Sequence, residues 1–411
     1  MPQLVFLASL LCLTWLLAAA GNFPLKNETA RGGDAKQITS GEARDDSPAW
    51  SLDKNAVRDS HSADLDDIAL NAEAQGFNGS VYIARNGTPI LDKAYGWTAP
   101  DRRRRVDTST LFNIASVSKA ITATAILGLV ETGNLSVHQR IEEILSGVPS
   151  DKESITIEEL LLHTSCLPDL YAANGLSSRD AAVKAILATR LLCKPGTEFH
   201  YTDDGYTLLA AIIEVVSGKQ YAHFVRENVF RPAGMKASKF WEEVDDRTSS
   251  DVARIVTLEL SNRQRGVNWG YIGPGGIWSN ADELARYFLA LMAGKIVTME
   301  SVSEMLMPRE KVSIGSAGYG WFIGRSTMDT PLILARGNED WGHSALIFWY
   351  PDRKILLTIA TNSGFDHGTP LSRVLAARLE GVLLSSCNRQ CNGPTAVLRM
   401  TATSRRLLSH E

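Results

Sequence analysis

A serine and a lysine stand three residues apart where a strongly apolar segment begins. The stretch 112–119 reads F-N-I-A-S-V-S-K, and A-I-T-A-T-A-I-L-G-L-V follows it. Residues three apart lie on one face of a helix, so Ser116 and Lys119 can touch. A helix that is apolar almost all round is buried, and burial is expected to lower the pKa of Lys119. A neutral amine beside a hydroxyl can accept its proton, which predicts a nucleophile and its base.

The place of Ser116 at the start of the predicted helix favours this chemistry. Free backbone N–H groups and the helix dipole stabilise negative charge that develops there. The spacing alone is not specific, because Ser51 and Lys54 repeat it in a polar stretch with no apolar helix behind them. The alternative is that Ser116 caps the helix and Lys119 extends its amine to solvent.

Several separated segments resemble one superfamily, the serine β-lactamases and penicillin-binding proteins. The similarity is closest to the class C branch, which includes D-alanyl-D-alanine carboxypeptidases, D-aminopeptidases and many esterases. F-N-I-A-S-V-S-K-A resembles its first motif, and three further segments follow in the expected order: I-E-E-L-L-L-H-T-S-C-L-P at 157–168, K-P-G-T-E-F-H-Y-T-D-D-G-Y at 194–206, and G-P-G-G-I-W-S-N-A-D-E-L-A-R at 273–286. The resemblance covers roughly residues 65 to 385 and implies the fold of that superfamily.

The resemblance also implies roles for single residues. Ser116 matches the nucleophile that becomes acylated, and Lys119 matches its proton partner. Tyr201 matches the tyrosine that serves as general base and then protonates the leaving group. A phenol near cations should have a lowered pKa and could shuttle protons at neutral pH. The alternative for Tyr201 is an ordinary half-buried tyrosine with a hydrogen-bonded hydroxyl.

The third family motif is Lys-Thr-Gly, often His-x-Gly in esterase-like members, and the sequence suggests Gly342-His343-Ser344-Ala345 for it. His343 would supply the cation, or else be a surface histidine at a strand end. Ser344 and Ala345 would line the substrate site. On this match, about half a dozen residues of the usual glycine-rich stretch are missing. Ala345 would have to provide the second N–H of the oxyanion hole, and losing one such donor costs about a hundredfold or more in rate.

Two substitutions depart from the family pattern. Asp203 stands where the family usually has asparagine, and an ionised carboxylate only accepts hydrogen bonds. We therefore expect Asp203 at the substrate site, where it would disfavour an anionic substrate group. Cys166 replaces the glycine of the family's H-T-S-G-L-P turn, so it is strained if that position requires positive φ.

Apart from Cys12 in the apolar N-terminal segment, the cysteines are even in number: Cys166, Cys193, Cys387 and Cys391. An even set is compatible with disulfides in an oxidising compartment, although the sequence does not give their pairing. Cys166 is either free or paired with Cys193. Because no Cys/His cluster has metal-ligand spacing, we expect no metal and no cofactor.

The elements that must position these residues follow from periodicity and turn signals. Strand patterns occur near residues 79–95, with the hairpin signal Asn86-Gly87 between them, and again after about residue 315. The middle, about 110–295, is mostly helical. We therefore predict an α+β fold in which an antiparallel sheet is built from both chain ends, flanked by helices, with a helical region inserted.

The two ends of the chain differ from this region. Residues 1–20 contain an apolar run that ends in small residues, which predicts a signal peptide, or else a membrane anchor. Residues 21–65 form a polar leader, residues 66–386 the catalytic domain and residues 387–411 a tail. Four glycosylation sequons, at Asn27, Asn78, Asn86 and Asn134, agree with a secreted or extracytoplasmic protein.

The net charge of −4 argues against nucleic acid as a partner. Isolated charge runs are usually solvated loops, and we read Arg102 to Arg105 in that way. The expected partner is a small-molecule or peptide substrate. The leading hypothesis is a serine hydrolase that acts through an acyl-enzyme on Ser116, on an ester, lactone, amide or D-residue peptide. The rival is a catalytically weak or inactive relative that binds a ligand or partner, and the shortened third motif favours it.

Overall fold

The computed structural model describes residues 61–245, 248–254 and 266–385 of the 411-residue chain. The predicted signal or anchor at 1–20, most of the polar leader and the tail after 386 lie outside the described residues. Within the described part, none of the helices combines the length and the hydropathy that crossing a bilayer requires.

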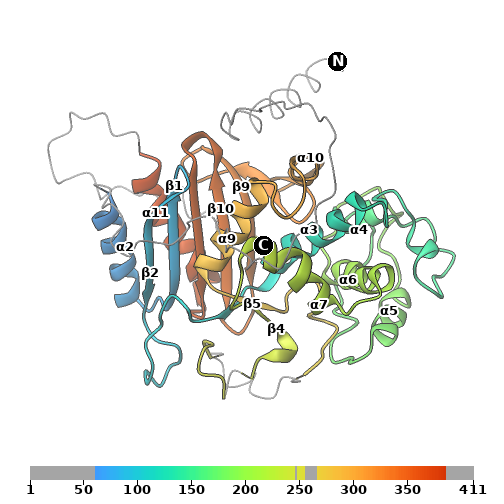
Figure 1. The fold of residues 1–411 in the computed structure, drawn as a ribbon, viewed down its shortest axis with the longest axis horizontal. Helices are drawn as coiled ribbons and strands as arrows, with labels where there is room; N and C mark the ends of the chain where they lie inside the picture. The colour runs from blue at the N-terminus through green and yellow to red at the C-terminus, as the bar shows by residue number, and fades with distance from the viewer. Residues whose placement is uncertain (1–60, 246–247, 255–265, 386–411) are drawn as a thin grey trace, which may run out of the picture. The chain divides into compact units, whose positions relative to one another are not determined.

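An eight-stranded antiparallel sheet forms the centre of the fold, in the order β2-β1-β11-β10-β9-β8-β7-β6. The first and the last of these eight strands in chain order pair with each other, with Gly79 of β1 opposite Thr361 of β11. The prediction of a sheet built from both chain ends is therefore confirmed (Figure 1). The strands are β1 (Gly79–Arg85), β2 (Thr88–Tyr95), β6 (Glu310–Val312), β7 (Gly315–Ala317), β8 (Phe322–Arg325), β9 (Pro331–Asn338), β10 (Ser344–Tyr350) and β11 (Ile355–Thr361).

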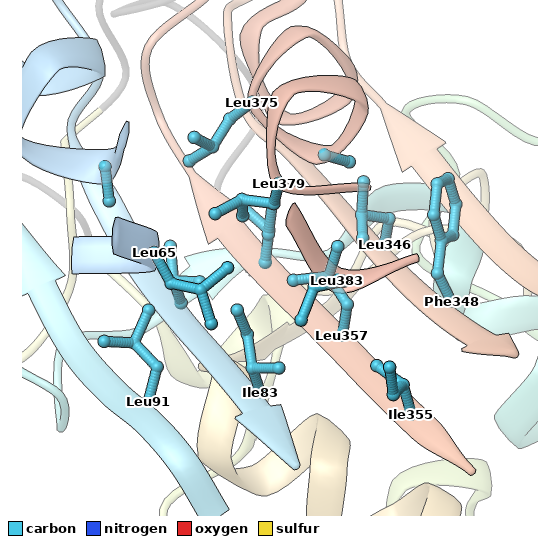
Figure 2. Packing of buried hydrophobic residues seen from close by; sticks show 14 of the residues in the cluster. Leu65, Ile83, Leu91, Leu346, Phe348, Ile355, Leu357, Leu375, Leu379 and Leu383 are labelled. Carbon is cyan, nitrogen blue, oxygen red and sulfur yellow. The ribbon is translucent and has the colours of Figure 1, made fainter. Parts of the chain in front are cut away.

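Helices cover both faces of this sheet. On one face, α2 (Ser62–Ala74) and α11 (Leu371–Leu383) pack on a leucine- and isoleucine-rich surface, with Leu375, Leu379 and Leu383 of α11 pointing at the strands (Figure 2). On the other face, α9 (Ala281–Met292) packs against β1 and β11. Every residue of β11 is buried, because a strand covered on both faces has no solvated side.

The helical region lies beside the sheet, between β2 and β6 in the chain (Figure 1). Besides α9 it contains α3 (Ser118–Glu131), α4 (Ile157–Leu161), α5 (Arg179–Leu187), α6 (Asp203–Ser217), α7 (Tyr221–Val225), α8 (Arg231–Ala233) and α10 (Met299–Met305). Two small sheets were not predicted, because their strands of two or three residues are too short to show a period: β3 (Phe112–Asn113), β5 (Ile277–Ser279) and β4 (Lys239–Phe240), and the pair β12 (Phe365–Asp366) and β13 (Thr369–Pro370).

Local signals explain where several elements begin and end. Asn86 and Gly87 both have positive φ in the turn between β1 and β2, as the predicted hairpin requires. Thr156 and Glu159 form a reciprocal capping box at the start of α4. Gly218 ends α6 in the left-handed conformation that favours glycine.

Candidate active site

Ser116 lies in a short 3₁₀ turn, η1 (Ala115–Val117), which leads directly into the buried helix α3. Two donors converge on its hydroxyl oxygen. The Lys119 ammonium group donates from 2.9 Å, and the Tyr201 hydroxyl donates from 2.8 Å. The structure therefore brings together the three residues that the sequence nominated as nucleophile, proton partner and acid–base group.

Lys119 is buried, with only 3% of the residue exposed. Its Nζ contacts three oxygen atoms: Oγ of Ser116 at 2.9 Å, Oδ1 of Asp203 at 2.5 Å and the carbonyl oxygen of Pro274 at 3.2 Å. A lysine ammonium has three donors and no acceptor, so three acceptors match the protonated form. Lys119 therefore rests as a cation paired with a carboxylate.

The expectation that burial lowers the pKa of Lys119 is wrong. Burial alone does act in that direction, but the charge of Asp203 and the neighbouring phenol of Tyr201 outweigh it. The pKa of Lys119 is raised above its ordinary value. The carboxylate that replaces the family's asparagine reverses the effect of burial, because an opposite charge in direct contact favours the ammonium form.

The pKa of Tyr201 also departs from the prediction. Burial raises it, Lys119 lowers it and Asp203 raises it, and the net shift is upward. The phenol is therefore protonated at neutral pH, in agreement with its donated hydrogen bond to Ser116. Tyr201 lies at the rim of the site, with 36% of the residue exposed. In this form it can act as an acid, and it becomes a base only at high pH.

Asp203 is the first residue of α6, where the helix dipole stabilises a negative charge. Its side chain is 14% exposed. Its backbone N–H donates to Oδ1 of Asp169 at 2.8 Å, so a second carboxylate lies at the same helix start. The sequence placed Asp203 at the substrate site; the structure gives it Lys119 as its direct partner.

His343 does not reach Ser116, and this corrects its predicted place in the site. The residue is fully buried. Its Nδ1 accepts a hydrogen bond from the backbone N–H of Asn113 at 3.0 Å, and its Nε2 lies 3.3 Å from the carbonyl oxygen of Arg254. Its ring packs against Phe112 and Trp278.

Ser344 and Ala345 are also placed elsewhere than predicted. The Ser344 hydroxyl donates to the hydroxyl of Ser372 at the start of α11. Ala345 pairs with Gly337 of β9 on one side and with Ala360 of β11 on the other, so both edges of its strand are occupied. An N–H of an inner strand cannot turn to an oxyanion, which removes Ala345 as that donor.

The strand beside the nucleophile is β9, not β10. At Gly337 its backbone approaches η1 so closely that an added Cβ would lie 2.7 Å from the carbonyl oxygen of Ile114 and closer still to the backbone nitrogen of Ser116. Only glycine permits this approach. Ala335 and Arg336 line the same cavity as Ser116, Lys119 and Tyr201.

The pairing pattern gives the direction of the N–H groups of β9. The N–H of Glu339 donates to the carbonyl oxygen of His343, on the side of β10. Directions alternate along a strand, so the N–H of Asn338 points to the opposite edge. The neighbouring strand β8 pairs with β9 only as far as Leu334. The edge at Asn338 is therefore the one that adjoins η1.

Comparisons with known proteins assign the chain to a family. A family model described as Beta-lactamase matches residues 68–380. The chain belongs to the beta-lactamase family. Penicillin-binding protein 4* of Bacillus subtilis is 29% identical over 321 residues, which are 72% of this chain and 70% of that protein. Protein flp of Staphylococcus aureus (strain MW2) is 31% identical over 170 residues, which are 39% of this chain and 34% of that protein.

The match to the first curated relative, from Bacillus subtilis, spans 62% of that relative's length. Among solved structures, the octameric penicillin-binding protein homologue from Pyrococcus abyssi has a TM-score of 0.67 and 26% identity, covering 78% of this chain and 76% of that one. The beta-lactamase/D-alanine carboxypeptidase from Yersinia pestis has a TM-score of 0.66 and 18% identity, covering 79% and 99%, and shares the fold.

In the beta-lactamase family the third motif lies on the strand beside the nucleophile. In this structure β9 is the strand in that position. We interpret Ala335-Arg336-Gly337 as its counterpart, with Gly337 at the close approach and Ala335 on the cavity in place of a cation. No residues are then missing, since residues 339–343 form the turn from β9 to β10. Sequence reasoning missed this; a glycine inside a strand pattern was the available signal.

The turn with Cys166 lies directly beside this site. Cys166 has a φ of 59° and forms a disulfide with Cys193, which answers the open question of its pairing. Cys193 also lies near Glu198 and His200, a group whose ligand atoms could approach a metal. Because the Cys193 sulfur is bonded to Cys166, it is not the thiolate that a metal would need.

Proposed function

We propose that the protein is a serine hydrolase that forms an acyl-enzyme on Ser116 and is more active at alkaline than at neutral pH. The observation that carries the proposal is the pair of donors on Ser116 Oγ, Lys119 at 2.9 Å and Tyr201 at 2.8 Å, beside the edge of β9. This arrangement supplies a nucleophile, a base once Lys119 loses its proton, and an acid. Solved structures that share the fold and carry hydrolase names support the assignment.

The acylation step begins from the neutral amine of Lys119. The proton of the Ser116 hydroxyl passes to Lys119 Nζ while Oγ forms a bond to the substrate carbonyl carbon. The carbonyl π-electrons move to the carbonyl oxygen, which becomes the oxyanion. The backbone N–H groups of Ser116 and Asn338 are our candidates for its two donors, since both lie where η1 meets the edge of β9.

Collapse of the oxyanion re-forms the carbonyl and breaks the bond to the leaving atom. Tyr201 is placed to donate its hydroxyl proton to that atom, which suits a phenol with a raised pKa. The proton that Lys119 received then restores Tyr201, and the ester on Ser116 remains. Water attacks this ester with the same groups in the reverse roles, releasing a carboxylic acid and free Ser116.

The acidic groups beside Lys119 support neutral esters and amides as substrates on that side of the site. The Asp203 carboxylate holds Lys119 and Asp169 lies at the same helix start, while Arg336 of β9 lines the same cavity. A substrate carboxylate near Asp203 would be repelled. The beta-lactamase/D-alanine carboxypeptidase and D-amino acid amidase names belong to the neighbours, and their substrates enter the test only as members of a panel.

The test is labelling by a fluorophosphonate probe together with hydrolysis of p-nitrophenyl esters, D-aminoacyl amides and a cephalosporin. Wild-type protein should be labelled and should hydrolyse neutral esters faster as the pH rises, and Ser116→Ala should abolish both. Ser51→Ala, which changes the other serine of this spacing, is the matched control and should leave both intact. A folded wild-type protein that is not labelled even at alkaline pH would overturn the proposal.

One observation favours a second candidate function, ligand binding without hydrolysis. Both groups that could accept the Ser116 proton hold their own protons at neutral pH, so the cleft could serve only to bind a ligand there. A shortened third motif does not support this candidate if β9 is the third strand of the site, as we interpret it. Absence of ester turnover at every pH, together with saturable binding of a panel compound, would select it.

We also propose that the protein is exported. The Cys166–Cys193 disulfide fits an oxidising compartment. Asn86 and Asn134, in two of the four sequons, are exposed and would be accessible to glycosylation. Expression of the full chain in a glycosylating host should give secreted protein whose electrophoretic mobility changes after deglycosylation. Retention of unglycosylated protein inside such cells would contradict the proposal.

A further inference from the structure

His163 contacts the chain on both sides of Tyr201. Its carbonyl oxygen accepts a hydrogen bond from the backbone N–H of His200 at 2.8 Å. Its ring Nδ1 accepts a second one from the backbone N–H of Thr202 at 3.2 Å. One residue therefore fixes the backbone immediately before and immediately after the tyrosine whose hydroxyl reaches Ser116.

The His163 ring also contacts the Tyr201 ring itself. The two ring centroids are 4.4 Å apart with an interplanar angle of 28°, a stacked arrangement. On other sides the imidazole packs against Tyr206 at 5.0 Å and Phe199 at 5.7 Å. His163 is 4% exposed and lines the cavity that holds Ser116 and Lys119. One face of the Tyr201 ring is thus stacked on a buried partner.

The turn that carries His163 is held in an unusual conformation. His163 and Cys166 both have positive φ, at 58° and 59°. Non-glycine residues rarely adopt this conformation, so surrounding contacts must enforce it. The Cys166–Cys193 disulfide and the hydrogen bond from Gly196 N–H to the Thr164 carbonyl oxygen do so. Both contacts tie the turn to the segment that leads to Tyr201.

Charge is not what His163 contributes. Burial and the positive charge of Lys119 lower the pKa of His163 well below its ordinary value. The ring is neutral at physiological pH, and since Nδ1 accepts a hydrogen bond its proton is on Nε2. A neutral ring neither stabilises a phenolate by charge nor competes with Lys119. What the ring does supply is contact with Tyr201 and with the backbone next to it.

We propose that His163 is a positioning residue for Tyr201, holding the phenol in hydrogen-bond reach of Ser116 through one ring stack and two backbone hydrogen bonds. The inference rests on the proposed hydrolase function for its kinetic consequences. Displacement of an acid–base group by about 1 Å costs about a hundredfold in rate. Loss of His163 should therefore lower kcat far more than it changes KM.

Two variants separate the contacts. His163→Asn keeps an acceptor near the position of Nδ1 and removes the stack, whereas His163→Phe keeps the stack and removes the acceptor. We expect kcat to fall about tenfold to a hundredfold in each, with KM changing less than about threefold. Tyr287→Phe is the stability control, because it removes a buried hydroxyl that bonds to α3 without contacting His163.

The decisive measurement is a double-mutant cycle with Tyr201→Phe. If His163 acts through the phenol, His163→Asn and His163→Phe should have little further effect on kcat in the Tyr201→Phe background. Equal effects in both backgrounds, or variants that lose stability as Tyr287→Phe does while keeping the wild-type kcat, would overturn the proposal.

A second readout does not need turnover. The titration of the Tyr201 phenol, taken as the ultraviolet difference between each protein and its Tyr201→Phe partner, should move in both His163 variants and stay in place in Tyr287→Phe. If the wild-type protein hydrolyses nothing, the proposed function fails and this titration still tests the positioning role. An unchanged titration would contradict it.

Discussion

Replacement of Asp203 by asparagine should make the protein a better hydrolase at neutral pH. Asp203 contacts the Lys119 ammonium at 2.5 Å and raises the pKa of both Lys119 and Tyr201. A group with a raised pKa loses its proton only at higher pH. The wild-type profile of kcat/KM should therefore rise toward alkaline pH, as the base is released.

The size of the shift in the pH–rate profile follows from the ion pair between Lys119 and Asp203. An opposite charge this close shifts a pKa by about 1–3 units, and each unit corresponds to about 1.4 kcal/mol. Asp203→Asn removes the charge and keeps an oxygen that can accept from Lys119. The rising limb of the profile should move down by about 1–3 pH units. Since a weaker base also accepts a proton less readily, we expect a net gain of about tenfold at neutral pH.

The assay is kcat/KM for a neutral p-nitrophenyl ester from about pH 5 to about pH 10, with circular dichroism to confirm folding. Asp180→Asn is the matched control, since Asp180 is also an acid in the first turn of a helix and its side chain is 83% exposed. It should leave the profile unchanged. A limb that stays in place in Asp203→Asn would refute the reasoning. Activity lost at every pH would refute it as well and would assign Asp203 a direct part in proton transfer.

Three further outcomes are expected. Gly337→Ala should lower kcat by about a hundredfold or more, because its Cβ would push β9 away from the nucleophile. Gly381→Ala is the control, since its Cβ meets nothing within 4 Å, and it should leave kcat unchanged. The Cys166–Cys193 disulfide closes a loop with a sequence separation of 27, and its reduction should lower the free energy of unfolding by about 3 kcal/mol. Unchanged stability in denaturant titrations would contradict the scaffold role of that turn. His343→Phe leaves a buried backbone N–H unpaired and should lower the free energy of unfolding by about 1–3 kcal/mol, while a shift of the pH–rate profile would restore His343 to the site.

The sequence predicted those parts of the molecule whose signals are local. The hairpin at Asn86-Gly87, the buried helix after Ser116 and the return of strands after about residue 315 all follow from turn chemistry and apolar patterns within short windows. The serine–lysine pair also needs only one turn of helix. Because these features depend on neighbours in the chain, they could be predicted without the fold.

Which strand lies beside Ser116 depends on contacts between residues far apart in the chain, so a short stretch of sequence does not reveal it. His343 was chosen because it resembles a motif before a strand, yet it is fully buried against the backbone of Asn113. Gly337 was passed over, although it approaches the nucleophile. Which strand adjoins η1 is decided by the order β11-β10-β9, and this order results from long-range pairing.

The charge state of the site was the other matter that only the tertiary structure decided. Residue types suggested a lysine with a lowered pKa and a tyrosine that ionises easily. A pKa depends on the net of burial and of charges at close range, and Asp203 lies 84 positions from Lys119 in the chain. The sequence by itself determined that Ser116 and Lys119 could react together. The fold decided that Lys119 rests protonated against a carboxylate, because it placed the start of α6 against the start of α3.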